Sequence, residues 1–258
     1  MKKFSLPCLI VVASLVFFTD AKSFGQDTNA AVVNTNAVVQ NTAIIPALRT
    51  NPTNWVARHN GFVEIAKKGN VDLLFMGDSI TDAWRGHGLN VWNKYYAPQH
   101  AANFGISGDR TEHVLWRMDN GELDGIKPKV VVLMIGTNNS GKERDGRLRN
   151  TIPQIIEGVT AVVADIRTKL PDSKILLLAI FPRGNTDDFQ RGEVAVINTA
   201  LAKLDDGNKV KFLDIGSKFL EADATLPKSI MPDLLHPNER GYQIWADAMN
   251  PTLDEMMK

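Results

Sequence analysis

Five continuous apolar runs constrain the fold of this chain more than any other feature of its sequence. They are residues 71–77 (VDLLFMG), 101–106 (AANFGI), 129–136 (KVVVLMIG), 174–181 (KILLLAIF) and 210–216 (VKFLDIG). Runs without alternation of polar and apolar residues are typical of strands that are buried on both faces. The sequence therefore predicts five buried strands.

Helical patterns separate these runs. Between the third and fourth, apolar residues recur at helical spacing and form one stripe: Ile152, Ile155, Ile156, Val159, Val162, Val163, Ile166 and Leu170. Repeated strand, helix, strand units predict an α/β fold, a three-layer α/β/α sandwich around a five-stranded parallel sheet. The chain has 258 residues, of which 44% are hydrophobic, which is enough for one domain core. We expect neither an internal repeat nor a second domain.

The first residues have the pattern of a secretory signal. Residues 1–23 have two lysines near their start, Lys2 and Lys3, followed by an apolar run over residues 6–18 and then small residues. The run is shorter than the roughly 18 to 20 apolar residues of a membrane-spanning helix. We predict a signal peptide at residues 1–23, and hence a secreted or periplasmic protein with no stable membrane span. Cys8, the only cysteine, lies in this segment, so the mature chain would have no thiol and no disulfide.

Residues 24–54 are rich in Asn, Thr, Ala and Val, without a sustained period. We interpret them as a low-complexity linker, although residues 44–48 could pack on the edge of the domain. The domain proper is predicted at residues 55–258. Lys+Arg and Asp+Glu balance at 29 each, so charge gives no reason to expect a nucleic-acid partner.

Chemistry is expected where the strands end, because ligands of open parallel sheets bind outside the carboxyl ends of the strands. Ser79 follows the first strand directly, in GDSITDAW. By itself it could be only the cap of the next helix. A serine hydroxyl becomes a useful nucleophile when a base accepts its proton.

His236 is the best candidate for that base. Asp233 precedes it by three residues, and Pro237 restricts it to an extended or turn conformation. The spacing allows the carboxylate to hold one ring nitrogen while the other faces a serine. Surface or packing roles are expected for the other histidines, His59, His87, His100 and His113.

Two further residues could stabilise an oxyanion, which needs N–H donors. Gly108, in GISGD, offers an unobstructed backbone amide after the second strand, and Asn138, in GTNN, offers a side-chain amide after the third. Each could also be an ordinary turn residue.

The stretches GDSIT, GISGD, GTNN and DLLHPN, in this order, resemble the four blocks of the SGNH or GDSL hydrolase (esterase/lipase) family. The stretch NFGISGDRTEHVLWRM also resembles the second block of the platelet-activating-factor acetylhydrolase branch. The similarity runs roughly from residue 55 to the C-terminus. It implies the flavodoxin-like fold of that family, no metal or organic cofactor, and possible pairing as a homodimer.

The resemblance also implies a role for each matching residue. Ser79 would be the nucleophile and, through its own N–H, the first oxyanion donor. Gly108 and Asn138 would be the other two donors, and Asp233 and His236 would complete the catalytic triad. Ile80 stands where the family often has Leu after the serine.

Other readings are weaker. The Gly-x-Ser-x-Gly elbow of another serine-hydrolase design is absent around Ser79, and so are phosphate-binding glycine motifs. The close spacing of Asp78 and Asp82 could belong to a metal site, but no clustered histidines accompany them. Trp84, Trp92 and Trp116 are expected to pack, and of these three Trp84 is expected to come nearest to the substrate.

The sequence thus predicts an exported serine esterase. Its loops at residues 140–149 and 182–192 are rich in charge, which favours short acyl groups, acetyl above all, on a polar alcohol such as a sugar or polysaccharide. A lipid or phospholipid ester is the main alternative substrate. A non-catalytic carbohydrate-binding module on a hydrolase scaffold is an alternative of a different class.

Overall fold

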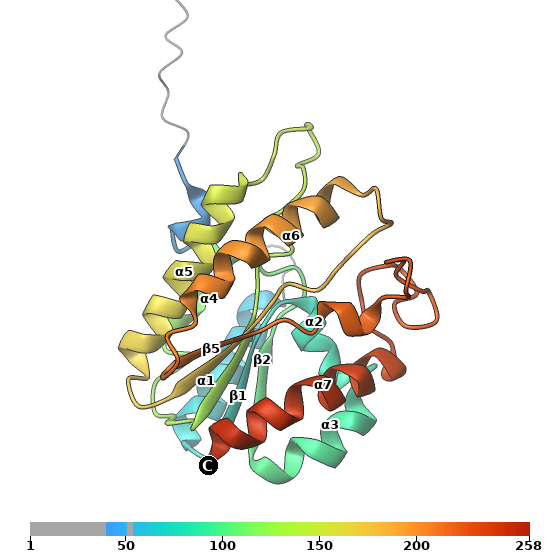
Figure 1. Ribbon diagram of the computed structural model, residues 1–258. Helices are drawn as coiled ribbons and strands as arrows, with labels where there is room; N and C mark the ends of the chain where they lie inside the picture. Colours follow the sequence, from blue (N-terminus) through green and yellow to red (C-terminus); the bar gives the residue numbers. More distant parts are fainter. Residues whose placement is uncertain (1–39, 51–53) are drawn as a thin grey trace, which may run out of the picture. The chain divides into compact units, whose positions relative to one another are not determined.

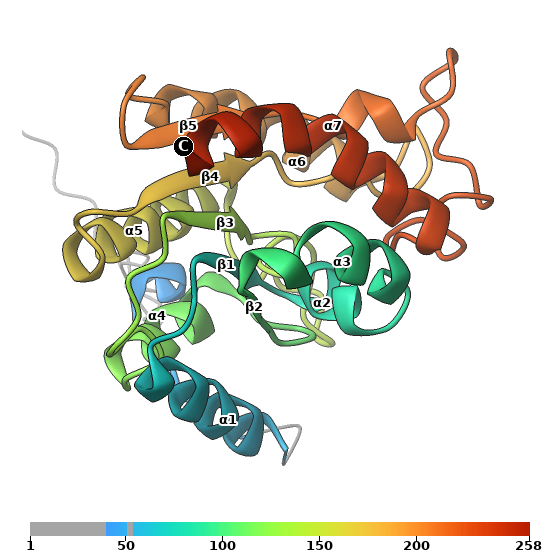
Figure 2. The same ribbon diagram turned by 90° about the horizontal axis from the view of Figure 1, so that it is seen from below.

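A five-stranded parallel sheet is the centre of the computed structural model, which describes residues 40–50 and 54–258. Figure 1 shows the sheet among its helices, and Figure 2 shows that the strands lie in the order β2-β1-β3-β4-β5. Their bounds are Leu73–Gly77 (β1), Ala101–Gly105 (β2), Val130–Met134 (β3), Lys174–Leu178 (β4) and Val210–Leu213 (β5). The order reverses after β2, so β1 lies between β2 and β3 and the segments following these three strands are neighbours.

Helices cover both faces of the sheet (Figure 2). One apolar core joins the sheet to α1 (Trp55–Lys68), α4 (Thr111–Asp119), α5 (Ile152–Lys169) and α6 (Phe189–Leu201). The second core joins the other face to α2 (Ser79–Asp82), α3 (Leu89–Tyr95) and α7 (Glu239–Met257). Short 3-10 turns occupy Thr42–Ile44, Ala83–Arg85, Ala97–Gln99, Ala202–Leu204 and Gly216–Phe219. The predicted three-layer α/β/α sandwich is confirmed.

Each apolar run contains one strand, but several runs extend past their strand. β3 ends at Met134 although the run continues to residue 136, and β4 ends at Leu178 although the run continues to residue 181. The extra residues Ile135, Ile180 and Phe181 are buried in the connections that leave the sheet. Burial alone therefore cannot mark where a strand ends.

The compact domain begins at Gln40, before the boundary predicted at Trp55. Part of the expected linker packs on the domain: Ala43 is fully buried, and its carbonyl accepts a 2.7 Å hydrogen bond from Thr111 Oγ1. Apolar and capping residues in this stretch outweigh its linker-like composition. The predicted signal peptide and residues 24–39 lie outside the described residues. Within the described part of the chain, no helix combines the length and apolarity needed to cross a membrane.

Candidate active site

Ser79 is the first residue of α2, immediately after β1. The Asp78 carboxylate caps this helix by accepting a 3.0 Å hydrogen bond from the Ile80 N–H. Gly77 permits the tight turn, because a Cβ there would lie 2.3 Å from both Met134 O and Thr81 Oγ1. The half-buried Ser79 is therefore held at the carboxyl edge of the sheet by packing that only glycine allows.

His236 reaches Ser79 from the segment before α7. Its Nε2 lies 2.9 Å from Ser79 Oγ, and its Nδ1 lies 2.6 Å from Asp233 Oδ2. The other carboxylate oxygen of Asp233 accepts the backbone N–H groups of Leu235 at 3.0 Å and His236 at 2.7 Å. We call residues 233–236 the acid–base loop. One aspartate thus fixes both the backbone and the imidazole of this loop.

The charge of Asp233 sets the tautomer of His236. Partial burial tends to raise the pKa of Asp233, but hydrogen bonds from the His236 side chain and backbone outweigh it and lower that pKa. The ionised carboxylate favours a proton on Nδ1, which leaves Nε2 free to accept the Ser79 proton. The loop is open to solvent: the side chain of Asp233 is 54% exposed and that of His236 33%.

Three N–H donors follow three adjacent strands. They are the backbone N–H groups of Ser79 after β1 and Gly108 after β2, and the side-chain amide of Asn138 after β3. Within the described residues, neither backbone group donates to a protein acceptor. Asn138 Nδ2 donates to Asp109 O at 2.9 Å, which fixes its amide and leaves its second N–H available.

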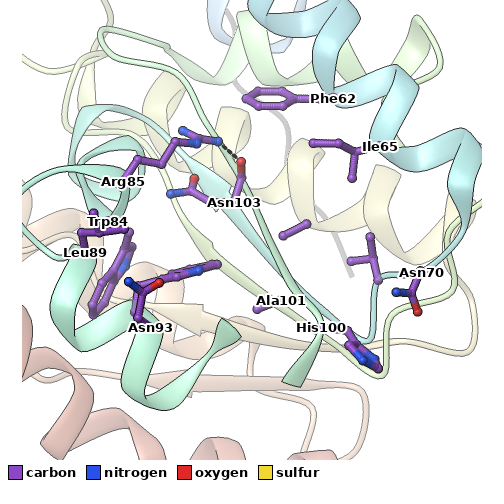
Figure 3. Close-up of a pocket in the computed structure, with 13 residues that line it drawn as sticks. Phe62, Ile65, Asn70, Trp84, Arg85, Leu89, Asn93, His100, Ala101 and Asn103 are labelled. Carbon is purple, nitrogen blue, oxygen red and sulfur yellow. Dashed lines mark hydrogen bonds between the residues drawn. The ribbon is translucent and has the colours of Figure 1, made fainter. Parts of the chain in front are cut away.

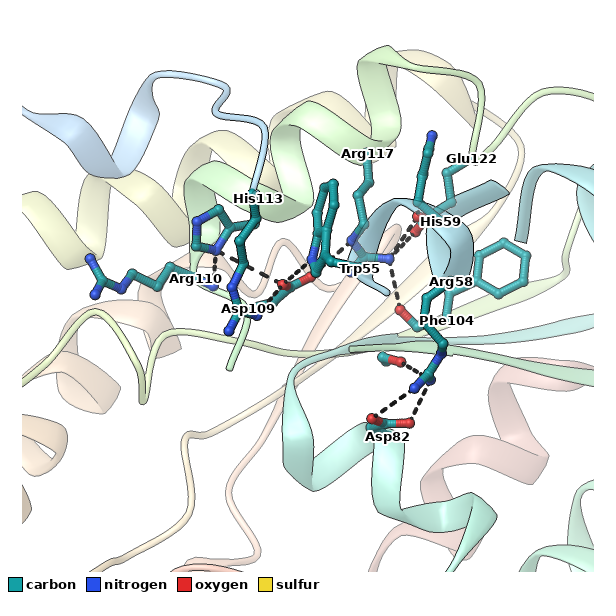
Figure 4. A network of polar contacts seen from close by, with 12 residues as sticks. Trp55, Arg58, His59, Asp82, Phe104, Asp109, Arg110, His113, Arg117 and Glu122 are labelled. Atoms are coloured by element: carbon teal, nitrogen blue, oxygen red, sulfur yellow. Dashed lines mark hydrogen bonds and ion pairs between the residues drawn. The ribbon is translucent and has the colours of Figure 1, made fainter. Parts of the chain in front are cut away.

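A buried charge network stands behind residues 107–109, which we call the oxyanion loop (Figure 4). Asp109 is fully buried, accepts a 2.7 Å hydrogen bond from Trp55 Nε1, and lies 3.0 Å from Arg117 Nε. Arg117, also fully buried, donates to Phe104 O at 2.9 Å and to both carboxylate oxygens of Glu122. Trp55 of α1 and Arg117 of α4 thus support the loop that carries Gly108 through buried contacts with Asp109.

The sequence favours a loop-fixing role for the Asp109 carboxylate over a catalytic one, but it does not reveal the partners of that carboxylate. Arg117 lies on a helix, and a charged residue on a helix is usually predicted to face the solvent. Its only sequence signal is its place in NFGISGDRTEHVLWRM, the stretch that resembles the family's second block. A second missed residue is Arg49, whose side chain lies against the oxyanion loop although the surrounding composition resembles that of a linker.

Asp78 carries the most unusual carboxyl group near Ser79. Burial raises its pKa to about 7; the Ile80 N–H and the charge of Arg183 oppose the rise, and the nearby Asp109 adds to it. Asp82 instead accepts from Arg58 Nη2 at 2.7 Å and from other donors. The two carboxylates, weighed above as a metal pair, therefore have separate tasks in capping α2 and binding arginine.

The remaining histidines have packing or surface roles. His59 is buried beside Glu122, and His113 accepts the Arg110 N–H at 3.0 Å. Burial lowers the pKa of His113 to about 3, and the nearby arginines add to this effect. His100 pairs with an exposed aspartate and His87 is exposed.

Trp84 is a packing residue, as expected. Its side chain is fully buried against Tyr242 and Trp245, with ring centroids 4.4 and 4.9 Å away. It is among the residues that line a cavity of about 410 Å³ beside the edge strand β2, between α1 and α3 (Figure 3). That cavity contains none of the five candidate site residues.

Comparisons with known proteins identify the family of this chain. The profile of the GDSL-like Lipase/Acylhydrolase family matches residues 75–244. The chain belongs to this family. Platelet-activating factor acetylhydrolase IB subunit alpha2 from Rattus norvegicus is 39% identical over 189 residues, which cover 73% of this chain and 78% of that protein. The human alpha1 subunit is 35% identical over the same length.

Solved structures share the fold. A GDSL-like lipase from Bacteroides thetaiotaomicron has a TM-score of 0.60 at 17% identity, covering 77% of this chain and 98% of its own. An acetylxylan esterase from Geobacillus stearothermophilus has a TM-score of 0.57 at 22% identity, covering 71% and 93%. Because of this family and these curated relatives, we identify the protein as a serine ester hydrolase.

Proposed function

We propose that this hydrolase is an exported esterase that removes short acyl groups, above all acetyl, from carbohydrate, with Ser79, His236 and Asp233 as its catalytic triad. The observation that carries the proposal is the continuous contact from Ser79 Oγ to His236 Nε2, at 2.9 Å, and from His236 Nδ1 to Asp233 Oδ2, at 2.6 Å. These distances suit proton transfer without rearrangement.

The reaction follows from the roles of these atoms. Ser79 Oγ attacks the acyl carbon while His236 Nε2 takes its proton, and Asp233 stabilises the resulting imidazolium. The N–H groups of Ser79 and Gly108 and the amide of Asn138 receive the oxyanion. The intermediate collapses, and His236 returns the proton to the departing alcohol. Water, activated by the same imidazole, then releases the acyl group and restores Ser79.

Three observations support a short acyl group on a polar alcohol. The acid–base loop is open to solvent, so an alcohol of varied size can approach. The loops at residues 140–149 and 182–192 carry many charged side chains. Relatives are named acetylhydrolases, and one structural neighbour is an acetylxylan esterase.

A lipid ester is the second candidate substrate, and specific side chains favour it. Leu148, in the loop at residues 140–149, and Phe189, in the loop at residues 182–192, are 42% and 58% exposed. They could contact an acyl or alkyl chain. The platelet-activating factor relatives point to the same class. The earlier alternative of a non-catalytic carbohydrate-binding module is set aside, because the family and its relatives identify an ester hydrolase.

The proposal of export rests on residues 1–23 alone. N-terminal sequencing of protein from the native envelope or medium is expected to find cleavage between about residues 21 and 26. An intact Met1 in cytosolic protein would contradict it. Pairing into a homodimer is likewise a proposal from the resemblance, to be checked by light scattering.

The activity is tested with purified mature protein on p-nitrophenyl acetate, acetylated xylan and a phospholipid acetyl ester, each compared with Ser79→Ala. We expect acetate release from the glycan that depends on Ser79. Turnover of the phospholipid alone would replace the carbohydrate proposal with the lipid one. Equal turnover by wild type and Ser79→Ala would refute the triad.

A further inference from the structure

The N-terminal arm, residues 40–50, is fixed to the domain near the oxyanion loop. Thr111 Oγ1 donates to Ala43 O at 2.7 Å, and Ala47 N–H donates to Glu112 O at 3.0 Å. Both partners belong to α4, the helix that directly follows the oxyanion loop. These two hydrogen bonds hold the end of the arm, with Arg49, beside the oxyanion loop.

Arg49 reaches from this arm onto the oxyanion loop. Its Nη1 donates to Ser107 O at 2.7 Å and to Asp109 Oδ1 at 3.1 Å. The guanidinium lies against the Cα of Gly108: a Cβ there would be 2.5 Å from Nη2. The side chain of Arg49 is 21% exposed: its contact with Asp109 is partly buried, and its contact with Ser107 O lies at the surface. One arginine thus contacts all three residues of the loop.

The contact with Ser107 O determines the direction of the Gly108 N–H. These two groups belong to one peptide unit, which is planar and trans, so they point in opposite directions. A donor that holds the carbonyl therefore also holds the N–H. Gly108 has φ +80°, a backbone conformation that favours glycine. A contact that fixes the neighbouring peptide therefore stabilises the conformation of the loop.

The charge of Arg49 has a second effect on the same peptide. A cation at the carbonyl oxygen polarises the peptide and makes its N–H a stronger donor. Asp109, the buried residue that follows Gly108, keeps the guanidinium of Arg49 in place by an ion pair at 3.1 Å. These contacts suit the Gly108 N–H, because an oxyanion donor must be aligned before charge develops on the substrate.

We infer that Arg49 is a positioning residue for the reaction: through Ser107 O and Asp109 it aligns and polarises the Gly108 N–H that stabilises the oxyanion. This rests on the proposed role of Gly108 in ester hydrolysis. Arg49 touches neither substrate nor nucleophile in this account. Its effect is expected in kcat, because the donor acts in the transition state.

The test compares Arg49→Ala and Arg49→Lys with Arg167→Ala, in the full chain on p-nitrophenyl acetate. Arg167 is the matched control, since it lies in the last turn of α5, its side chain is 37% exposed and its ion pair is with Asp206. Arg49→Ala should lower kcat about 10-fold, less than the roughly 100- to 1000-fold typical for deleting a donor. KM should change by less than about twofold, and Lys should recover part of the loss.

Chemical rescue separates positioning from folding. Guanidinium at millimolar concentration, far below denaturing levels, should restore part of kcat in Arg49→Ala and leave Arg167→Ala unchanged. Wild-type kcat in Arg49→Ala, or a loss that follows only its unfolded fraction and is not rescued, would overturn the inference. Equal turnover by wild type and Ser79→Ala would instead remove the proposed function and this inference with it.

Discussion

Two aspartates, Asp109 behind the oxyanion loop and Asp233 in the acid–base loop, show how differently the two halves of the site are built. Asp109 is fully buried and is held by Trp55 and two arginines. Asp233 is 54% exposed and is bound to the imidazole and backbone of its own loop. The donor half is anchored through α1 and α4, whereas the proton-transfer half is a local turn at the surface.

This difference agrees with the demands on each half. Oxyanion donors contribute most when they are already aligned as charge develops, so a rigid buried support is useful. The imidazole must exchange its proton with an incoming water and a departing alcohol, so access is useful. We therefore expect changes in the acid–base loop to alter activity with little change in stability, and changes behind the oxyanion loop to alter stability.

The largest expected effect comes from removing the base of the acid–base loop. His236→Ala should lower kcat about 10,000-fold, because Ser79 then lacks its base. The free energy of unfolding, from urea titration, should stay within about 0.5 kcal/mol of wild type, as for other exposed sites. Loss of stability comparable to that of a core variant would show that the acid–base loop is structurally integrated after all.

The next effect concerns the buried half. Arg117→Met should lower the free energy of unfolding by about 3 to 5 kcal/mol, because Asp109 and Glu122 would remain buried without their cation. Urea titration is the measurement, and Arg147→Met is the exposed control. A change below about 1 kcal/mol, as is usual for surface ion pairs, would mean that the network does not support the loop.

Asn138→Ala sharpens the comparison within the donor half itself. One N–H donor is lost while the charge network stays intact, so kcat should fall about 100- to 1000-fold with KM nearly unchanged. Steady-state kinetics on p-nitrophenyl acetate give both constants. A higher KM at constant kcat would instead assign Asn138 to ordinary substrate binding.

A smaller effect follows from Asp78, at the junction of the two halves. The carboxyl ionises near 3.8 when unfolded, and burial raises its folded pKa to about 7. Between these values the folded state holds a proton that the unfolded state lacks, so stability falls as pH rises from about 4 to about 7. The contribution is at most about 1.4 kcal/mol per pH unit.

Asp78→Asn should remove this slope while keeping a good cap for α2. Urea titrations at several pH values between 4 and 8 would compare the two proteins. The prediction fails if both have the same pH dependence, which would mean that Asp78 is ionised at its ordinary pKa in the folded protein.

The smallest expected effect concerns the acyl chain. In a preformed apolar pocket each added methylene would contribute roughly 0.8 kcal/mol. At this open, charged site we expect no such gain, and therefore a preference for acetyl over octanoyl p-nitrophenyl esters. A kcat/KM that rises steadily with acyl length would assign the exposed Leu148 and Phe189 to a lipid chain.

The sequence predicts the sheet, both layers of helices and the positions of the five candidate site residues, because apolar runs and the residues at strand ends are local signals. Its limit is contact between distant segments. Nothing in the composition of residues 24–54 predicts that Arg49 meets Ser107 or that Ala43 is buried. From the sequence, Arg117 is likewise predicted to lie at the surface, because its partners Asp109 and Glu122 are recognised only in the folded structure.

The most direct test of the account is covalent labelling of its nucleophile with a fluorophosphonate, followed by mass spectrometry of the digested protein. The donor half should accept the tetrahedral adduct and the acid–base half should activate the hydroxyl. We predict one adduct, on Ser79, which is absent in Ser79→Ala and nearly absent in His236→Ala. Labelling at another serine, or undiminished labelling of His236→Ala, would contradict the account.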